Sequence, residues 1–532
     1  MSKPESEPVA PKAVAVIDIG ANSVRMVIAQ VLADGQTEVL ERTQRPVRLG
    51  HDTFVTGRLS QQAMNATIAI LRDCKKLLDT YAVEIVRAVA TSAVREADNG
   101  DAFVDRVAMA VGLDLEVLDP TEESHLTVSA VREAVHGAVD LGAGRALIAD
   151  VGGGSMLLTS LDGGANTASQ SYALGSVRLQ EHLATVHEPL ERGVELLRHQ
   201  IANAVDVIKR SMPLSEVGAF LAVGEDARFA AQRIGEAVPS AELVHMVDAA
   251  AFDRLVEQCA QRSAERLARD YSLAFPSAER LVPALLIYHD LLHATPADRM
   301  VVCSVSMRDG LLLDVARRVT GEEDAELAES IVQSARTIGE TYRVDPAHAE
   351  HVTRLALRLF DELHREHGLT PRHRLLLRVA GALHEVGKFV SSRAHHKHSC
   401  YLIANSEVFG LRRGEMALVA QIARYHRRSE PKTSHADYMT LPREERIAVN
   451  KLASILRVAD ALDRGHAQQV QDFQIERRGT ELIIYVSGVA DLTLERRALA
   501  EKGDMFEDTY GMRVRLEETA PASEARRASP ME

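Results

Sequence analysis

The first part of the chain alternates strand-like apolar runs with amphipathic helical segments. The pattern predicts a β-hairpin-like pair over residues 14–32 and 37–40 and a buried strand over residues 85–90. Between them, apolar residues recur at helical spacing up to Leu78, and Ser60 stands where this helix needs an N-cap. Strands and helices in alternation predict an α/β arrangement.

The same plan returns in the second part of the chain. Residues 146–150 and 156–161 predict paired strands, a third strand follows near residues 220–223, and helices continue to about residue 318. Two halves of similar design predict two similar lobes that close on a cleft.

The pattern changes at about residue 321. Residues 321–469 show long helical periodicity and many histidines, which predicts an all-α domain. Residues 470–517 predict a small α+β module, in which strands flank a helix around residues 492–508. The expected organisation is therefore two lobes, an all-α domain, a small module and two flexible tails, over residues 13–135, 136–320, 321–469 and 470–517, with tails at 1–12 and 518–532.

The composition is that of an ordinary globular protein with several domains. The chain has 532 residues, of which 46% are hydrophobic and 26% charged. Its net charge of -14 argues against a nucleic-acid partner, so an anionic ligand would need local basic patches. No stretch reaches the ~18 apolar residues of a membrane span. Four cysteines stand far apart, which is typical of a reducing compartment, and we expect a cytoplasmic protein.

Two predicted strands end in closely similar turns. Each has an aspartate, then small residues and a serine: Asp18-Ile-Gly-Ala-Asn22-Ser23 and Asp150-Val-Gly152-Gly153-Gly154-Ser155. Small residues let backbone N–H groups approach an anion, Ser and Asn side chains add hydrogen bonds, and the aspartate can hold Mg²⁺. One such turn is usually an ordinary end of a strand. Two of them are what a two-lobed fold needs to hold phosphate from both sides.

In order and spacing, these motifs resemble the exopolyphosphatase/guanosine pentaphosphatase (Ppx/GppA) family of the sugar kinase, Hsp70 and actin superfamily. Four further segments are similar to family motifs: Ala90-Thr-Ser-Ala-Val-Arg95, Glu122-Glu123, Leu174-Gly-Ser-Val-Arg178-Leu179 and Ser306-Met-Arg308-Asp-Gly-Leu311. The resemblance implies an α/β fold with two actin-like (ribonuclease H-like) lobes and a cleft between them. An all-α HD-like domain and the small α+β module would follow.

The resemblance also implies an activity, Mg²⁺-dependent hydrolytic release of the terminal phosphate of inorganic polyphosphate. Guanosine pentaphosphate, hydrolysed to guanosine tetraphosphate, is the related substrate. Glu123 would orient and deprotonate the attacking water, and Arg95 would bind the terminal phosphate. Asp150, and after it Asp18, would hold Mg²⁺, and the phosphate cradle would comprise Asn22, Ser23, Gly152, Gly153, Gly154 and Ser155. A monovalent cation such as K⁺ is a further candidate cofactor, and a homodimer is expected.

Some of these residues have a purely structural alternative. Glu122 and Glu123 are also suited to the first turn of a helix capped by Thr121. Arg95 could instead pair with Glu96 or Asp98 on the surface.

One turn departs from the family pattern. Glu225-Asp226 stands where the family has a second glycine and then threonine. Two carboxylates there would repel phosphate, so this turn either faces away from the substrate or narrows the range of ligands.

The helical domain contains a series of histidines in the order used by HD-type metallophosphohydrolases. The series comprises His351, His384-Glu385, His395-His396-Lys397-His398, His426 and Asp460. Glu385 stands in place of an aspartate, and its extra methylene displaces the carboxylate by about a bond length. We therefore favour histidines that pack between helices over a working metal site.

Two basic segments of the same domain offer another interpretation. Residues 393–398 and 424–428 could face one groove and guide a polyphosphate chain. Candidate channel residues are Arg393, His396, Lys397 and Arg427, with Arg45 and Arg48 nearer the cleft. A solvated basic face would give the same pattern.

Two other functions compete with hydrolysis. One is an ATP-dependent kinase of the same superfamily, which would need an adenosine pocket and an acceptor site. The other is a non-catalytic sensor that binds polyphosphate or an alarmone without turnover.

Overall fold

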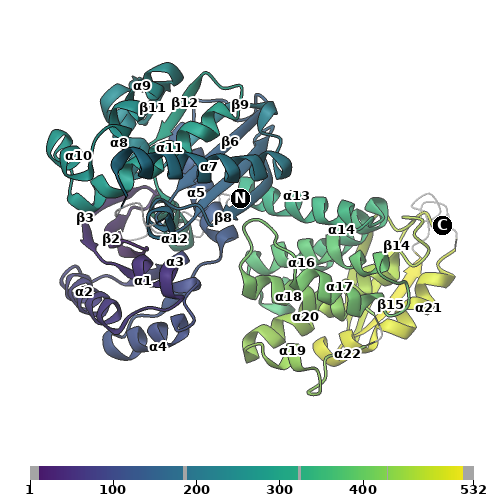
Figure 1. Cartoon of the computed structure of the whole chain (residues 1–532). Helices are drawn as coiled ribbons and strands as arrows, with labels where there is room; N and C mark the ends of the chain where they lie inside the picture. Colours follow the sequence, from purple (N-terminus) through teal and green to yellow (C-terminus); the bar gives the residue numbers. More distant parts are fainter. Residues whose placement is uncertain (1–10, 184–187, 321–324, 428, 490, 519–532) are drawn as a thin grey trace, which may run out of the picture. The chain divides into compact units, whose positions relative to one another are not determined.

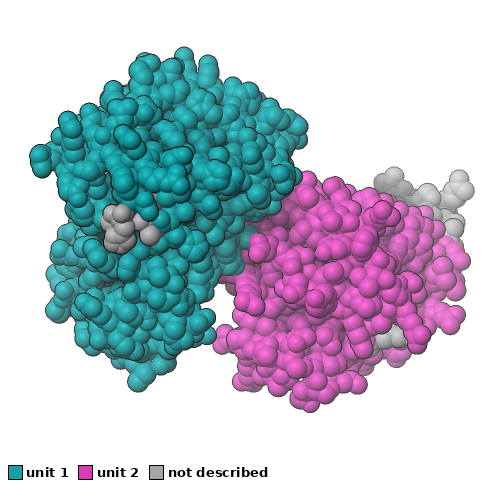
Figure 2. Space-filling model, viewed as in Figure 1, with its two compact units in different colours: residues 1–324 teal, residues 325–532 magenta. Residues whose placement is uncertain are grey.

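The computed structural model describes residues 11–183, 188–320, 325–427, 429–489 and 491–518 (Figure 1). The chain forms two compact units, residues 1–324 and residues 325–532, which Figure 2 shows in different colours. The first unit contains two mixed sheets, and the second is mainly helical.

The first sheet has five strands in the order β3-β2-β1-β4-β5, in which β1 pairs antiparallel with β2 and parallel with β4. Its strands are β1 (Lys12–Ile19), β2 (Ser23–Val31), β3 (Thr37–Pro46), β4 (Ile85–Ala90) and β5 (Leu115–Val117). The helices that follow them are α1 (Leu49–Thr56), α2 (Gln61–Thr80), α3 (Ser92–Arg95), α4 (Gly100–Val111) and α5 (Pro120–Val135). The expected cap of α2 is confirmed, because the Ser60 side chain accepts from the Ala63 amide at 3.2 Å.

The prediction for residues 14–32 was wrong in one respect. This stretch is two antiparallel strands, β1 and β2, and the strand that follows runs to Pro46 instead of ending at Leu40. The turn at 20–22 that separates β1 from β2 belongs to the Asp18–Ser23 motif, which was predicted to end a strand, so the strand bounds were wrong and the turn was not.

The second sheet has seven strands in the order β10-β11-β12-β9-β6-β7-β8. They are β6 (Arg145–Val151), β7 (Met156–Asp162), β8 (Ala165–Tyr172), β9 (Val217–Val223), β10 (Glu236–Val238), β11 (Ala241–Asp248) and β12 (Arg299–Cys303). Its helices are α6 (Ser176–Leu183), α7 (Leu190–Ser211), α8 (Glu225–Ile234), α9 (Ala249–Ala260), α10 (Ala264–Tyr271) and α11 (Phe275–His293), with a 3-10 turn at Leu214–Glu216. The predicted strands β6, β7 and β9 are all present, and β6 pairs antiparallel with β7 and parallel with β9.

Two helices tie the lobes together. Helix α12 (Met307–Thr320) follows the second sheet but packs on β1 and on α5 of the first lobe. Residues Val14, Val16, Leu126 and Leu311 share one apolar cluster there. Helix α5 also contacts strands of the second sheet. The segment that carries Glu122 and Glu123 is therefore enclosed between the two lobes.

The second unit begins with helices and ends in a three-stranded sheet, β13-β14-β15. Its elements are α13 (Ala325–Thr341), α14 (Pro346–Glu362), α15 (His364–His367), α16 (Pro371–Leu383), α17 (His395–Ala404), α18 (Arg413–Arg424), α19 (Ala436–Met439), α20 (Arg443–Leu462), β13 (Phe473–Arg478), β14 (Glu481–Val486), α21 (Thr493–Lys502), α22 (Asp504–Tyr510), β15 (Arg513–Glu518) and a 3-10 turn at Val386–Phe389. The helix expected around residues 492–508 is two helices that meet at Gly503. Sheet and helices share one apolar core.

The four cysteines are free thiols in buried positions, as expected from their spacing. Among the described helices, none combines the length and the apolar character that a membrane crossing requires.

Gly310 allows the close contact between α12 and α5, so Gly310→Ala should destabilise the first unit. An added Cβ would overlap the backbone carbonyl of Leu126, which cannot rotate away. Overpacking of this kind costs about 1–3 kcal/mol of unfolding free energy, measurable by denaturant unfolding. The matched control is Gly218→Ala, where the new Cβ would lie 3.8 Å from the nearest atom. Equal stabilities of the two variants would show that the helices do not depend on this contact.

Candidate functional site

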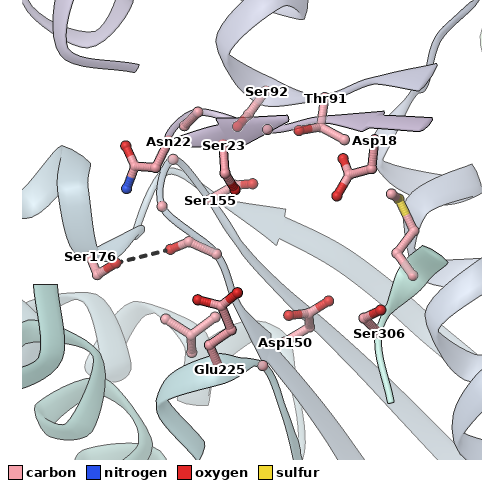
Figure 3. A pocket seen from close by; sticks show the side chains of 18 of the residues that line it. Asp18, Asn22, Ser23, Thr91, Ser92, Asp150, Ser155, Ser176, Glu225 and Ser306 are labelled. Carbon is pink, nitrogen blue, oxygen red and sulfur yellow. Dashed lines mark hydrogen bonds between the residues drawn. The ribbon is translucent and has the colours of Figure 1, made fainter. Parts of the chain in front are cut away.

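A pocket of about 900 Å³, part of it open to solvent, lies where the two lobes of the first unit meet. It is lined by both predicted turns, and Figure 3 shows the side chains of Asp18, Asp150 and Glu225 directed into it. All eight residues predicted to form the phosphate cradle or to hold the metal line this one pocket: Asp18, Asn22, Ser23, Asp150, Gly152, Gly153, Gly154 and Ser155. Their individual roles stay predictions.

The two turns have the same backbone geometry. Each turn closes with one hydrogen bond, from the Gly20 amide to the Ser23 carbonyl at 3.0 Å and from the Gly152 amide to the Ser155 carbonyl at 2.9 Å. Each follows a central strand of its sheet, β1 or β6. The duplicated motif of the sequence is thus a duplicated structure.

The two turns also touch each other. A Cβ on Gly153 would lie 3.4 Å from the Ala21 Cβ and 3.4 Å from the Asn22 side-chain nitrogen. The carbonyl of Gly154 accepts from the Arg178 Nε at 2.5 Å, and the same guanidinium binds Glu96 of the first lobe. Glycine at these positions lets the lobes approach with the backbone of both turns at the pocket.

Asp150 has the surroundings of a cation ligand. Its carboxylate is reached from the pocket but enclosed by protein, and burial raises the pKa of Asp150 to about 6, opposed by a hydrogen bond from the Thr127 hydroxyl at 3.3 Å. A bound cation would relieve this cost of burying a charge. Carboxylate and hydroxyl oxygens are the ligands that Mg²⁺ prefers. The donor set therefore fits Mg²⁺.

Asp18 is less well placed to hold a metal. Its Oδ2 lies 3.6 Å from Arg308 Nη1 and 3.9 Å from Arg25 Nη1, so two guanidinium groups already share its charge. The order of the two predicted metal ligands, Asp150 before Asp18, agrees with this environment.

Glu123 is buried and is not among the residues that line the pocket, but it lies near enough to two of them, Asp150 and Asp18, for their charges to act on it. Burial raises the pKa of Glu123 to about 7; Arg95, which donates to the carboxylate, opposes the rise, and the charges of Asp150 and Asp18 add to it. A carboxylate with a pKa near 7 can accept a proton at neutral pH, as a general base must. The environment of Glu123 matches the role that the resemblance implies.

The start of helix α5 explains how Glu123 is held. Asp119, not Thr121 as expected, is the N-cap, and its carboxylate accepts from the Glu122 amide at 2.8 Å, with Pro120 as the first helical residue. The acidic pair does occupy the first turn of a helix. Its two members point to different partners, because Glu122 pairs with Arg87 at 2.5 Å.

Arg95 is not a surface ion-pair partner of Glu96 or Asp98. It donates to Glu123 and, at 2.6 Å, to the Leu118 carbonyl, whereas Glu96 pairs with Arg178. Arg95 is absent from the described pocket lining, so its predicted contact with phosphate stays a prediction.

The Glu225-Asp226 turn lines the pocket. The alternative that this turn faces away from the pocket is therefore wrong. The Glu225 carboxylate accepts from Arg25 at 2.6 Å, from Gln44 at 3.2 Å and from Arg280. Burial alone would raise the pKa of Glu225, but Arg25 and Arg280 outweigh it and lower the pKa to about 2. Arg25 and Gln44 belong to the first lobe, so Glu225 links the two lobes across the pocket.

Asp226 remains closer to protonation than its neighbour. It is buried, and burial raises its pKa to about 6, although Arg280 Nε lies 3.7 Å away and opposes the rise. The two carboxylates of this turn therefore differ in charge near pH 6.

Sequence reasoning missed the four arginines of the pocket, Arg25, Arg228, Arg280 and Arg308. Three of them keep a buried nitrogen without a hydrogen-bond acceptor among the described residues: Arg25 Nε, Arg280 Nε and Arg308 Nη1. Guanidinium groups with spare donors bind phosphate oxygens well. Arg308 stood within a quoted motif, and Arg25 follows Ser23 by two positions on the same strand, so both could have been found.

The two channel candidates of the first unit do not line the pocket. Arg45 and Arg48 are exposed. Arg45 lies near Asp73 and Cys74 of α2, and Arg48 lies near Glu279. Neither environment favours a channel role.

The basic segments of the second unit do come together. Burial and the charge of Arg427 lower the pKa of His396 to about 4, with Lys397 and Arg424 adding to the shift. Arg393 and Lys397 are exposed. Arg428, the last residue of the second segment, lies outside the described residues. The channel role of this cluster stays a prediction.

Comparison with known proteins identifies relatives over most of the chain. The sequence profile of the Ppx/GppA phosphatase family matches residues 26–319, and that of Ppx/GppA phosphatase, domain III, matches residues 332–503. A Vibrio atlanticus protein named guanosine-5'-triphosphate,3'-diphosphate pyrophosphatase is 25% identical over 467 residues, 85% of this chain and 86% of that protein. A Vibrio vulnificus protein of the same name is 26% identical over 460 residues, 84% and 85% of the two chains.

A solved structure supports the fold. The crystal structure of an exopolyphosphatase from Cytophaga hutchinsonii aligns with a TM-score of 0.52 at 22% identity and covers 59% of this chain and 99% of that chain. Together with the family match, it confirms the predicted class, actin-like lobes followed by a helical domain.

Glu225 occupies two arginines that could otherwise bind an anion, so Glu225→Gln should strengthen phosphate binding. Removal of one charge should lower the Kd for inorganic phosphate about tenfold, or ~1.4 kcal/mol, in calorimetric titration of the whole protein. Glu181→Gln is the control, because Glu181 pairs with the exposed His51 outside the pocket lining. Unchanged or weaker binding by a folded Glu225→Gln variant would mean that Arg25 and Arg280 do not receive the anion.

Proposed function

The chain belongs to the Ppx/GppA phosphatase family, and on this basis we propose that it releases the terminal phosphate of linear phosphoanhydrides by Mg²⁺-dependent hydrolysis. Inorganic polyphosphate is the leading substrate. Guanosine pentaphosphate, converted to guanosine tetraphosphate, is the related one, since relatives bear the corresponding pyrophosphatase name.

One observation carries the proposal. The buried carboxylate of Glu123 has a pKa raised to about 7. It lies beside a pocket that is lined by the two predicted turns and by four arginines. A pocket that only bound phosphate would need the turns and the arginines. The glutamate adds a group that can take a proton from water, and this favours hydrolysis over binding alone.

The pocket can hold the end of a phosphate chain from several sides. The amides of Gly153 and Gly154 donate to no acceptor among the described residues, so they are available to phosphate oxygens. The spare guanidinium donors of Arg25, Arg280 and Arg308 supply positive charge. Fixing the chain end in one orientation lowers the entropic part of the barrier.

Hydrolysis then needs a water in line with the terminal phosphorus–oxygen bond. Glu123 would orient this water and take its proton while the water oxygen bonds to phosphorus. The bond to the bridging oxygen breaks, and that oxygen leaves on the shortened chain. Arg95 holds Glu123 in place through its direct hydrogen bond.

Asp150 is the residue best suited to hold Mg²⁺, with Asp18 beside it in the pocket. When bound, Mg²⁺ supplies positive charge that neutralises the non-bridging oxygens of the substrate. The expected K⁺, the homodimer and the cytoplasmic location stay predictions.

The test is orthophosphate release from long-chain polyphosphate with Mg²⁺, comparing wild type with Glu123→Gln. Loss of the base should lower kcat about 10²–10⁴-fold. Glu122→Gln is the matched control, because this neighbour faces Arg87 and should keep activity within a few-fold. If the wild type releases no orthophosphate, the proposal is wrong. A requirement for ADP would support the kinase alternative, and binding without turnover would support the sensor alternative. Full activity of Glu123→Gln refutes the assignment of the base alone.

The same enzyme should show a defined pH dependence. Glu123 must be deprotonated to act, so kcat/KM should fall about tenfold per pH unit below an apparent pKa near 7. Glu123→Gln should lack this acid limb. An unchanged acid limb in the variant would assign it to another group of the pocket.

A further inference from the structure

The histidines of the second unit form a cluster beside a pocket on its surface. His348 comes from α14, His384 directly follows α16, and Asp460 lies on α20. One ligand atom from each of the three lies within 4.8 Å of the others. His348 and His384 are fully buried, and Asp460 is 7% exposed.

The ring nitrogens of the two histidines are used unequally. His384 Nδ1 lies 2.7 Å from the Gly381 carbonyl, which can only accept, so Nδ1 carries the hydrogen and Nε2 the lone pair. His348 Nδ1 lies 2.7 Å from the Asp463 carboxylate, which can only accept, so this Nδ1 also carries the hydrogen. Burial lowers the pKa of His348, but Asp460 and Asp463 outweigh it and raise the pKa to about 9, so a metal ion at Nε2 would displace a proton. The Nε2 atoms of both are buried without a hydrogen-bond partner. Buried polar atoms usually have a hydrogen-bond partner. Several other histidines also leave a buried ring nitrogen without one among the described residues, so the distinguishing feature here is that two such atoms lie together beside a carboxylate.

Asp460 supplies negative charge at this point. Its Oδ1 lies 3.5 Å from His348 Nε2 and 3.9 Å from His384 Nε2. Its other oxygen is held by the Lys502 ammonium, which leaves Oδ1 for the cluster. Ligand atoms bound to one ion at about 2.1 Å stand roughly 3.0–3.4 Å apart. Small side-chain shifts would therefore bring the three atoms into range of one ion.

Glu385 is not one of the three residues of the cluster. Its Oε1 lies 3.9 Å from His348 Nε2 but pairs with the Lys388 ammonium, and Glu385 groups with His348 and His466, not with His384 and Asp460. The cluster therefore does not use the position at which Glu385 replaces aspartate.

A second pair of histidines borders the cluster. His426 Nδ1 faces the Ala423 carbonyl at 2.5 Å, so His426 carries its hydrogen on Nδ1 and a lone pair on Nε2. The Nε2 atoms of His426 and His395 lie 3.1 Å apart, the distance of a hydrogen bond in which His395 donates. These two histidines therefore partner each other and are not among the three residues of the cluster.

We propose that the second unit binds a divalent transition-metal ion through His348 Nε2, His384 Nε2 and Asp460 Oδ1. Two imidazole nitrogens and a carboxylate suit Zn²⁺, Mn²⁺ or Fe²⁺, whereas Mg²⁺ prefers oxygen ligands only. The hydrogen bonds on both Nδ1 atoms orient the rings, as they do in known metal sites. This site is separate from the proposed Mg²⁺ site of the first unit.

The ion would have an open side. Asp460 and Glu385 line a pocket together with Lys388, Arg427 and Arg464. Cations around an exposed metal face suit an anion such as phosphate as the further ligand.

Equilibrium dialysis of the chelator-treated whole protein against Zn²⁺ or Co²⁺, followed by metal analysis, tests the proposal. We expect about one ion per chain at micromolar or lower Kd in this unit, and at least tenfold weaker binding by His384→Gln. His367→Gln is the matched control, because His367 is a buried histidine with both ring nitrogens hydrogen-bonded, and it should bind like wild type. His293→Gln removes a half-exposed group of Asp253, His289 and His293 and should not affect this site.

A measurement on wild type alone keeps the proposal testable if His384→Gln does not fold. Proton NMR of the Co²⁺ form should show two strongly shifted, solvent-exchangeable signals, from the Nδ1 hydrogens of His348 and His384. Absence of both signals, or equal metal binding by a folded His384→Gln variant, would overturn the proposal. Metal that is lost only in His293→Gln would overturn it as well.

Discussion

The pocket between the two lobes depends on one constraint, the mutual neutralisation of buried charges. Four carboxylates and four guanidinium groups line it: Asp18, Asp150, Glu225 and Asp226, with Arg25, Arg228, Arg280 and Arg308. Neither set could be enclosed alone, because an unpaired buried charge is costly. The side chains of the pocket are therefore close to neutral in sum, and a polyanionic substrate needs further cations to balance its charge. This explains why a phosphate pocket can contain carboxylates and why Mg²⁺ fits its chemistry.

The fold places these charges through contacts that tolerate little change. Two turns of identical hydrogen bonding touch through glycine, and Glu225 joins Arg25 of one lobe to Arg280 of the other. Helix α5 lies between α12 and the second sheet, so Glu123 keeps its position relative to both turns. Substrate phosphates would compete with Glu225 for the same arginines. Substrate binding and the linkage between lobes are thus coupled through one carboxylate.

Structural features that depend on local sequence pattern were predicted, whereas contacts between residues distant in the sequence were not. The strands β6, β7 and β9, the helix capped by Ser60, and the paired turns follow from apolar periodicity and small residues. The full length of β3 was not predicted, because residues 41–45 are polar and mostly exposed and show no apolar pattern. Gln44 and Arg280 reach Glu225 from positions 181 and 55 residues away, and no local pattern shows such contacts. The unused Nε2 atoms of His348 and His384 likewise appear only in the folded protein.

Hydrolysis of polyphosphate in water enriched in oxygen-18 tests the central claim, that water activated by Glu123 attacks the terminal phosphorus held at the two turns. Mass spectrometry of the products locates the new oxygen. The account predicts one oxygen-18 atom in each released orthophosphate and none in the shortened chain. Label in the new end of the chain instead would place the attack on the penultimate phosphorus and contradict the account.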